Sequence, residues 1–470
     1  MTIVALGILA FVAVQLGIGV WASRRIASGD DYLVAGRRLG VGLAGFSIFA
    51  TWFAAESIMG ASASIAADGL AGGRADPLGY GICLLLLGFF FAARMRRTES
   101  ATLAEVFRGR YGVGAERIAA LVMIPTSLIW GAAQIKAFGH VLAFETPLAV
   151  DGAIIVAAVL VITYTLLGGL LGDVITDAVQ GSIVLVGVLA MAVALVMRFG
   201  GPAEAVAMIE PTQLALVPAG ESIWTRLDTW LVPVIGALIV QETASRVLAC
   251  RTATVARNAA LMGGGLYLVF GAVPVVIGLL GAHLGMDLSE DAQDSFIPVA
   301  ARELLHPVVY VVFVGALVSA ILSTVDSTIL AIGALVSNDL LPARMMTQRR
   351  RLVAARLVVV LSGVACCLIA LRGTSILDLV MESDSFGTAG IAVVGVMGLL
   401  TGFGGLWAAS ATLIVGIASA LVFNYLFPID APFMASLGCS AGTFFVIGLA
   451  EKRRGKGCRA PRGGTAADVG

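Results

Sequence analysis

Hydroxyl and carboxyl side chains gather in the middle of an otherwise apolar stretch, residues 306–337. Ser323, Thr324, Asp326 and Ser327 stand almost side by side there, and helical spacing brings Ser323 and Ser327 onto one face. Hydroxyl and carbonyl oxygens are hard ligands, so they suit a small hard cation such as Na⁺ by the argument that applies to Ca²⁺ and Mg²⁺. The alternative interpretation is close helix packing, which small hydroxyl residues also favour.

Polar and charged residues also interrupt the apolar stretch 40–67, at Thr51, Trp52 and Glu56. A helix that unwinds at this point frees backbone carbonyls, which a membrane tolerates only where they line a cavity or bind an ion. The stretch 228–248 is interrupted in the same way, by Pro233, Gly236, Gln241 and Glu242. Two interrupted spans that lie five spans apart indicate a five-plus-five (5+5) inverted repeat with a binding site near the membrane midplane.

Further charged residues lie inside apolar stretches, where each one is a functional candidate because its transfer into lipid is costly. Lys136 follows Trp130 by six residues. Its side chain could pair with Glu56 or Glu242, bind a carboxylate of a substrate, or extend toward the outer interface with its ammonium in water. Glu382 and Asp384 stand near the outer end of the stretch 379–401, and we expect both at the extracellular mouth.

The composition explains why these residues stand out. The chain is 59% hydrophobic and only 13% charged, and about 20 consecutive apolar residues are enough for one membrane crossing. The pattern predicts an all-α integral membrane protein with 13 transmembrane helices. The predicted spans are 2–22, 40–67, 76–94, 115–144, 150–170, 174–197, 228–248, 258–283, 306–337, 353–371, 379–401, 405–427 and 432–450.

The distribution of positive charge predicts how the chain crosses the membrane. Most of the 30 Lys and Arg residues, Arg246 among them, fall in alternate gaps between the predicted spans. The positive-inside rule then places the N-terminus outside and the C-terminus in the cytoplasm of a multi-pass protein of the plasma or inner membrane. We predict a single membrane domain, 1–450, with a core at 40–401, and a disordered cytoplasmic tail at 451–470.

Composition and spacing also argue against other classes of protein. No basic or acidic tail indicates a nucleic-acid partner, and no obligate protein partner is evident from the sequence. His140, His283 and His306 lie far apart, without the spacing of a metal site or a nucleophilic triad, so we do not expect an enzyme. The cysteines fall in apolar stretches or in predicted cytoplasmic segments, so we do not expect disulfides.

Three motifs carry a resemblance to the sodium:solute symporter family. They are DYLVAGRR at 31–38, GGL at 168–170 followed by TDAVQ at 176–180, and AILSTVDS at 320–327. The resemblance covers about residues 20–450. It implies the inverted-repeat fold of the bacterial leucine transporter, with discontinuous helices in the spans 40–67 and 228–248.

The resemblance implies a sodium site where the first of these spans meets 306–337. Position by position, it would use the backbone carbonyls of Ala50, Phe53 and Ala320 and the hydroxyls of Ser323 and Thr324.

Two carboxylates could hold a second cation near this site. Asp177 matches an acid that in some family members helps to hold or pass one, and Asp326 is a further candidate. The alternative for Asp177 is a helix N-terminal charge that the helix dipole favours.

Within the family the sequence is most similar to the choline-transporter branch, in which aromatic rings form a cage for a quaternary ammonium. This chain keeps Trp52, Tyr80 and Trp130, but it has Val240 where an aromatic residue is expected, and it adds Glu56. The substrate could therefore be a choline-like cation, an amino acid or an organic acid. The predicted substrate-binding residues are Trp52, Glu56, Tyr80, Trp130, Lys136 and Gln241.

The function implied is sodium-coupled secondary active symport, in which Na⁺ entry drives import of a small polar organic solute by alternating access. One alternative is a proton-coupled carrier of the same fold, in which Asp177 and Asp326 exchange protons. Another is a membrane solute sensor, although the segment after residue 450 is too short for a kinase domain. The expected partners are the solute, Na⁺ and membrane lipid.

Overall fold

The computed structural model describes residues 34–341, 348–373 and 375–454, together with Gly7, Ala13, Val14 and Gly17. The predicted span 2–22 and the end of the chain after Arg454 lie outside the described residues, apart from those four positions. Within the described residues every regular element is helical, and the only β-type contact is an isolated bridge between Leu39 and Cys250. The expected all-α class is confirmed.

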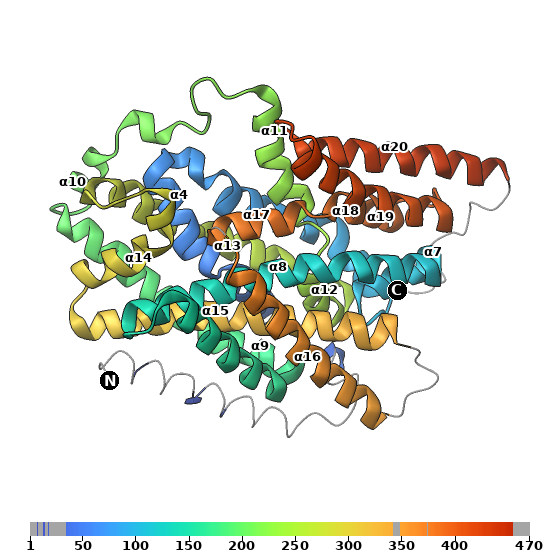
Figure 1. The fold of residues 1–470 in the computed structure, drawn as a ribbon, viewed down its shortest axis with the longest axis horizontal. Coiled ribbons are helices and arrows are strands. Elements are labelled where there is room, and N and C mark those ends of the chain that lie inside the picture. Colours follow the sequence, from blue (N-terminus) through green and yellow to red (C-terminus); the bar gives the residue numbers. More distant parts are fainter. Residues whose placement is uncertain are drawn as a thin grey trace, which may run out of the picture.

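The helices run in chain order through the whole described region (Figure 1). They are α3 (Val41–Trp52), α4 (Ala61–Asp68), α5 (Tyr80–Leu86), α6 (Ala92–Arg97), α7 (Leu103–Tyr111), α8 (Val113–Glu145), α9 (Val150–Arg198), α10 (Pro202–Met208), α11 (Ile223–Leu231), α12 (Gln241–Leu248), α13 (Ala253–Gly281), α14 (Glu290–Leu304), α15 (Pro307–Ala334), α16 (Gln348–Ala370), α17 (Ile376–Ser385), α18 (Thr388–Leu400), α19 (Leu406–Leu421) and α20 (Pro432–Arg453).

Nine helical segments of the described chain are long and apolar enough to cross a membrane, and a tenth is added if α17 and α18, which meet at 48°, form one bent span. Val41–Trp52 and Val150–Thr163 are shorter apolar helices. α9 contains both of the spans predicted at 150–170 and 174–197. The multi-pass membrane class is confirmed at this level, and the count of 13 stays a prediction.

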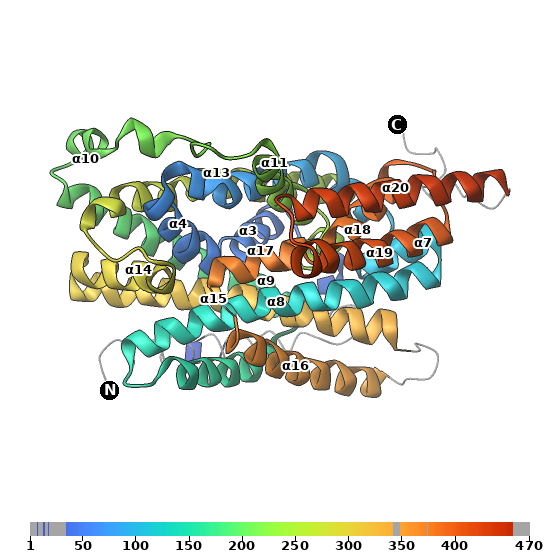
Figure 2. The same ribbon diagram turned by 45° about the horizontal axis from the view of Figure 1, so that its top comes forward.

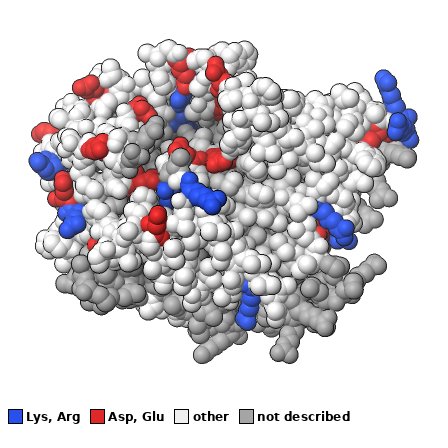
Figure 3. Space-filling view, in the orientation of Figure 1, with Lys and Arg blue, Asp and Glu red and all other residues white. Residues whose placement is uncertain are grey.

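Apolar side chains on the outside of the bundle fit a lipid environment. α16 exposes large apolar residues at helical spacing, namely Val353, Leu357, Leu361, Val364 and Leu368. α16 lies along one side of the bundle, and α20 lies along the opposite side in both ribbon views (Figures 1 and 2). On the face shown in Figure 3, most charged side chains gather toward the end that carries α10 and α14, and only a few lie on the rest of the drawn surface.

Two helices are interrupted near the middle of the bundle. α3 ends at Trp52 because Phe53 leaves the helical region (φ −86°, ψ 68°), and helical turns resume at Glu56. The helical turns that follow α11 stop after Gly236, and α12 begins only after Val240, which is extended (φ −116°, ψ 151°). A side-chain hydrogen bond of 2.6 Å from Trp52 Nε1 to Thr243 Oγ1 joins the two interrupted regions.

Candidate functional site

A small pocket lies beside the two interruptions. Its cavity is about 30 Å³, which is room for a few water molecules at most. An organic solute therefore requires the walls to move apart. The lining residues are Trp52, Glu56, Tyr80, Thr126, Ser127, Trp130, Val240, Glu242, Val380, Ser383, Asp384 and Thr388. They come from α3, α5, α8, α12, α17 and α18 and from the turns beside the two breaks.

Three aromatic residues predicted from the sequence meet at this pocket. The ring centroids of Trp52 and Tyr80 are 5.5 Å apart, and those of Trp52 and Trp130 are 6.2 Å apart. Ring faces in this arrangement attract a desolvated cation.

Three carboxylates line the same pocket. Glu56 accepts hydrogen bonds from Trp130 Nε1 at 3.1 Å and from Gln134 Nε2 at 2.7 Å. Glu242 accepts one from Ser127 Oγ at 2.5 Å. Asp384 accepts one from the hydroxyl of Tyr80. The described lining contains no Lys, Arg or His, so its ionisable groups are all acids.

Two of the predicted substrate-binding residues do not line this pocket. Lys136 is buried and donates to the carbonyl of Gly373 at 3.2 Å, without an ion pair to Glu56 or to any other acid in the described chain. Gln241 accepts from the backbone N–H of Leu103 at 2.7 Å and donates to Ser245, so it joins α12 to the start of α7.

The predicted sodium-site residues lie where the end of α3 meets α15. Thr324 Oγ1 donates to the carbonyl of Thr51 at 2.8 Å, and Ser323 Oγ donates to Asp177. α9 passes close by, because a Cβ built on Gly181 would lie 3.1 Å from the Cβ of Ala50. The structure therefore brings the α3 break, α15 and Asp177 together.

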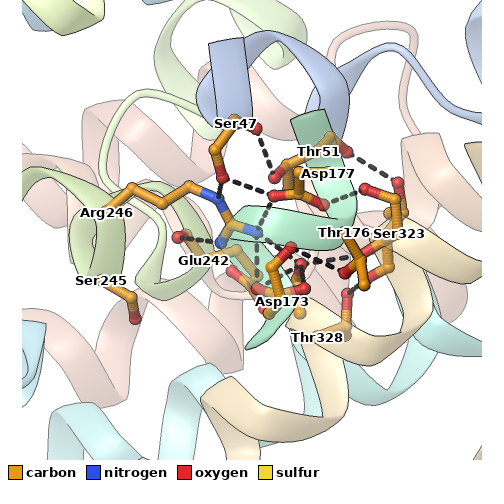
Figure 4. Close-up of polar contacts among 12 residues, drawn as sticks. Ser47, Thr51, Asp173, Thr176, Asp177, Glu242, Ser245, Arg246, Ser323 and Thr328 are labelled. Atoms are coloured by element: carbon orange, nitrogen blue, oxygen red, sulfur yellow. Dashed lines mark hydrogen bonds and ion pairs between the residues drawn. The ribbon is translucent and has the colours of Figure 1, made fainter. Parts of the chain in front are cut away.

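A buried arginine stands beside this junction. Arg246 Nη2 contacts Asp173 at 2.8 Å, Asp177 at 3.0 Å and Ser327 Oγ at 2.5 Å, and its Nε donates to Ser47 Oγ at 2.9 Å. The side chains of Arg246 and of both aspartates are at most 1% exposed. These residues, with Ser323, are called the Arg246 cluster below (Figure 4).

Comparison with known proteins decides the family. The model of the sodium:solute symporter family matches residues 32–401. The chain belongs to the sodium:solute symporter family. The resemblance found in the three motifs is thereby confirmed.

Two named transporters and one solved structure are similar to this chain. The human high affinity choline transporter 1 is 27% identical over 366 residues, which are 71% of this chain but only 61% of that transporter. The sodium/pantothenate symporter of Haemophilus influenzae is 21% identical over 90% of both chains. A solved structure of a Na⁺-coupled sialic acid symporter, substrate-bound and outward-open, has a TM-score of 0.82 at 18% identity, covering 98% of this chain and 99% of that one. That likeness establishes the fold.

Sequence reasoning misplaced two residues of this family member. Arg246, counted above with the cytoplasmic gap cations, is in fact 1% exposed in the core. Two carboxylates four residues apart, Asp173 and Asp177, were a signal that a cation should face them. Asp384 was expected at the extracellular mouth, but it lines the pocket. Asp384 lies four residues after Val380 and four residues before Thr388, and this helical spacing indicates that the three side chains share one face.

Asp326 lies near Asp177 and Arg246 but makes no hydrogen bond with the Arg246 cluster. It is 1% exposed, and neither of its carboxylate oxygens accepts a hydrogen bond from the described part of the chain. Thr165 lies near it, but the hydroxyl of Thr165 donates to the carbonyl of Val161.

Proposed function

We propose that this family member is a sodium-coupled secondary active symporter that imports a small organic solute by alternating access. Its 13 spans would form one membrane domain, 1–450, with the N-terminus outside and the C-terminus in the cytoplasm. In this proposal the interruptions after α3 and before α12 are the discontinuous helices of a five-plus-five inverted repeat. The likeness to the Na⁺-coupled sialic acid symporter supports the fold on which the proposal depends.

The observation that carries the proposal is the end of α3. The last carbonyls of a helix have no partner within the helix. Here Phe49 O accepts from the N–H of Phe53, Thr51 O from Thr324, and Trp52 O from Ser57. In the described chain the carbonyl oxygens of Ala50 and Phe53 accept no hydrogen bond that would close the end of the helix. These two carbonyls, at the end of α3 and just after it, are the ones assigned above to sodium.

The two hydroxyls from α15 complete the proposed site. The protons of Ser323 and Thr324 point to Asp177 and to Thr51 O, so their oxygen lone pairs stay available to a cation. The Arg246 cluster holds two carboxyl groups, those of Asp173 and Asp177, against one guanidinium beside the site. The carboxylate of Asp177 supports binding of Na⁺, and Ala320 would supply the fifth oxygen.

The pocket indicates which solute the symporter would carry. Aromatic faces and three carboxylates favour a small organic cation over an amino acid or an organic acid. The name of the human relative, a choline transporter, points in the same direction. Each positive charge that enters with a membrane potential of 100 mV gains about 2.3 kcal/mol.

Proton coupling remains a second candidate because of Asp326. Asp177 is held by Arg246, Ser47 and Ser323, which leaves it poorly placed to exchange protons. Asp326 accepts no hydrogen bond from the described residues, so it is the better candidate for a proton-binding group.

Binding of ²²Na⁺ to the purified protein tests the sodium site without a known solute. We expect saturable binding that weakens by about tenfold or more in Ser323→Ala and in Thr324→Ala, since each loses one ligand to a charged species. Thr328→Ala is the matched control, because Thr328 is a buried hydroxyl on α15 that donates to the carbonyl of Thr324. Equal ²²Na⁺ affinity in all four proteins would refute the site.

A further inference from the structure

The hydrogen-bond donors that line the pocket all point at protein acceptors. Trp52 Nε1 donates to Thr243 Oγ1, and Trp130 Nε1 donates to Glu56. The hydroxyls behave alike: Tyr80 donates to Asp384, Ser127 to Glu242, Thr126 to the carbonyl of Met123, Ser383 to the carbonyl of Thr126, and Thr388 to the carbonyl of Asp384. A ligand in the pocket therefore meets ring faces and acceptors, and no free side-chain donor of the described lining.

The acceptors are only partly used. Glu242 accepts through Oε1 and Asp384 through Oδ2. Their other oxygens, Glu242 Oε2 and Asp384 Oδ1, accept no hydrogen bond from another side chain of the described residues, although the Glu242 carboxylate also lies near its own backbone N–H and near Arg246. The two carboxylates come from different walls, α12 and α17, and they lie close enough to repel each other. Asp384 accepts one hydrogen bond and has no cation partner in the described chain. A buried carboxylate in this state is costly, so the pocket is incomplete without a ligand that supplies a positive charge and a further donor.

We infer that this pocket selects a protonated amine that carries N–H donors over a quaternary ammonium. The inference rests on the proposed function, because it names the class of solute that the symporter would carry. A quaternary ammonium satisfies the ring faces through its charge, but it has no N–H. Its head group donates no hydrogen bond to Asp384 or Glu242, and buried acceptors left in this way are unfavourable. A ligand carboxylate would find no free side-chain donor.

A methylation series separates these possibilities. Ethanolamine, N-methylethanolamine, N,N-dimethylethanolamine and choline share one chain and one positive charge, while each added methyl group removes one N–H. Dissociation constants are measured by titration calorimetry on the full-length protein in detergent. Each compound is titrated once with saturating NaCl and once with KCl in place of NaCl. We expect affinity to fall along the series, with choline at least about tenfold weaker than ethanolamine, the effect of losing one hydrogen bond to a charged group.

Amide variants test whether the two carboxylates cause this preference. Asp384→Asn and Glu242→Gln remove a charge and add N–H donors, yet they keep an oxygen for Tyr80 and for Ser127. We expect each to reduce the preference for ethanolamine over choline by about tenfold. Glu382→Gln is the matched control, because Glu382 lies on the same helix but contacts Tyr425 and does not line the pocket. It should keep the wild-type preference.

The outcomes distinguish the inference from the function beneath it. Choline that binds as tightly as ethanolamine, or a series in which no member binds, overturns the inference. Sodium-dependent binding of choline alone would leave symport standing and refute the amine class. A clear order from ethanolamine to choline that is the same without sodium would support the amine class and refute sodium coupling.

Discussion

The Arg246 cluster and the pocket are both built on α12, but they differ in how their carboxylates are satisfied. In the cluster each oxygen of Asp173 and of Asp177 accepts at least one hydrogen bond, from Arg246 or from a serine. In the pocket, Glu242 and Asp384 each accept a hydrogen bond from only one other side chain of the described residues, and through only one oxygen. Both regions are buried and acidic, so burial and charge alone do not separate them.

The difference suggests different tasks for the two regions. A network with every acceptor satisfied is rigid and costly to disrupt, because loss of one member leaves its neighbours unpaired. A partly satisfied pocket gains free energy when a ligand completes it. The cluster would therefore hold α3, α9, α12 and α15 in place around the sodium site, while the pocket would bind solute.

The largest expected effect comes from removing the arginine of the cluster. Arg246→Ala leaves Asp173 and Asp177 buried beside each other without a cation, which costs about 3–5 kcal/mol of unfolding free energy. We expect a large fall in the melting temperature of the purified protein, measured by its tryptophan fluorescence. Combining Arg246→Met with Asp173→Asn and Asp177→Asn should restore much of the loss, because no charge is then left unpaired.

Arg251→Ala is the control for this experiment, since Arg251 is exposed just beyond α12 and its loss should change stability by less than about 0.5 kcal/mol. An Arg246→Ala protein that melts with the wild type would mean that the cluster is not a structural support.

Overpacking of the pocket wall at Gly236 should have the next largest effect on stability and binding. A Cβ on Gly236 would lie 2.4 Å from the carbonyl oxygen of Asp384, so Gly236→Ala must push α17 away from the turn that precedes α12. Overpacking of this kind costs about 1–3 kcal/mol. We expect a modest loss of stability and a clear loss of ethanolamine affinity, because Asp384 moves with α17.

Gly265→Ala provides the comparison, because a Cβ on Gly265 of α13 meets nothing within 4 Å. If Gly236→Ala binds ethanolamine as Gly265→Ala does, α17 does not set the shape of the pocket.

Much of this architecture follows from local patterns in the sequence. Apolar length predicts helices and membrane crossings, and a spacing of four brings Ser323 and Ser327 onto one face of α15. The family motifs add the pairing of α3 with α15. The chain itself therefore carries the class of the protein and the elements of its proposed sodium site.

Other features depend on which helices meet, and one sequence does not specify this. Lys136 points to Gly373 and away from Glu56, because α8 turns that side toward the start of α17. Arg246 enters the core because α9 presents two carboxylates opposite it. These pairings are tertiary, and neither hydropathy nor charge counting records them.

The smallest expected effect comes from a satisfied contact behind the pocket wall. Asp294 of α14 accepts the backbone N–H of Ile376, the first residue of α17, at 3.2 Å, and His140 Nε2 lies 3.8 Å from its other oxygen. The pKa of Asp294 is raised from 3.8 to about 6, chiefly by burial and to a smaller extent by nearby Asp378, while the hydrogen bond from Ile376 and the charge of Lys136 act in the opposite direction.

An acid whose pKa is raised by folding binds its proton more tightly in the folded state, so ionisation destabilises that state. Between pH 5 and pH 7 the folded protein loses this proton while the unfolded chain has already lost it. The unfolding free energy of the wild type should therefore fall by about 1 kcal/mol relative to Asp294→Asn as the pH rises through this window. Asparagine keeps an oxygen for Ile376, and it cancels the pH effects of His140 and Asp378 from the difference because both proteins share them. Parallel melting temperatures of the two proteins at pH 5 and pH 7 would show that folding does not raise the pKa of Asp294, and the carboxyl group behind the start of α17 would then be better solvated than its burial indicates.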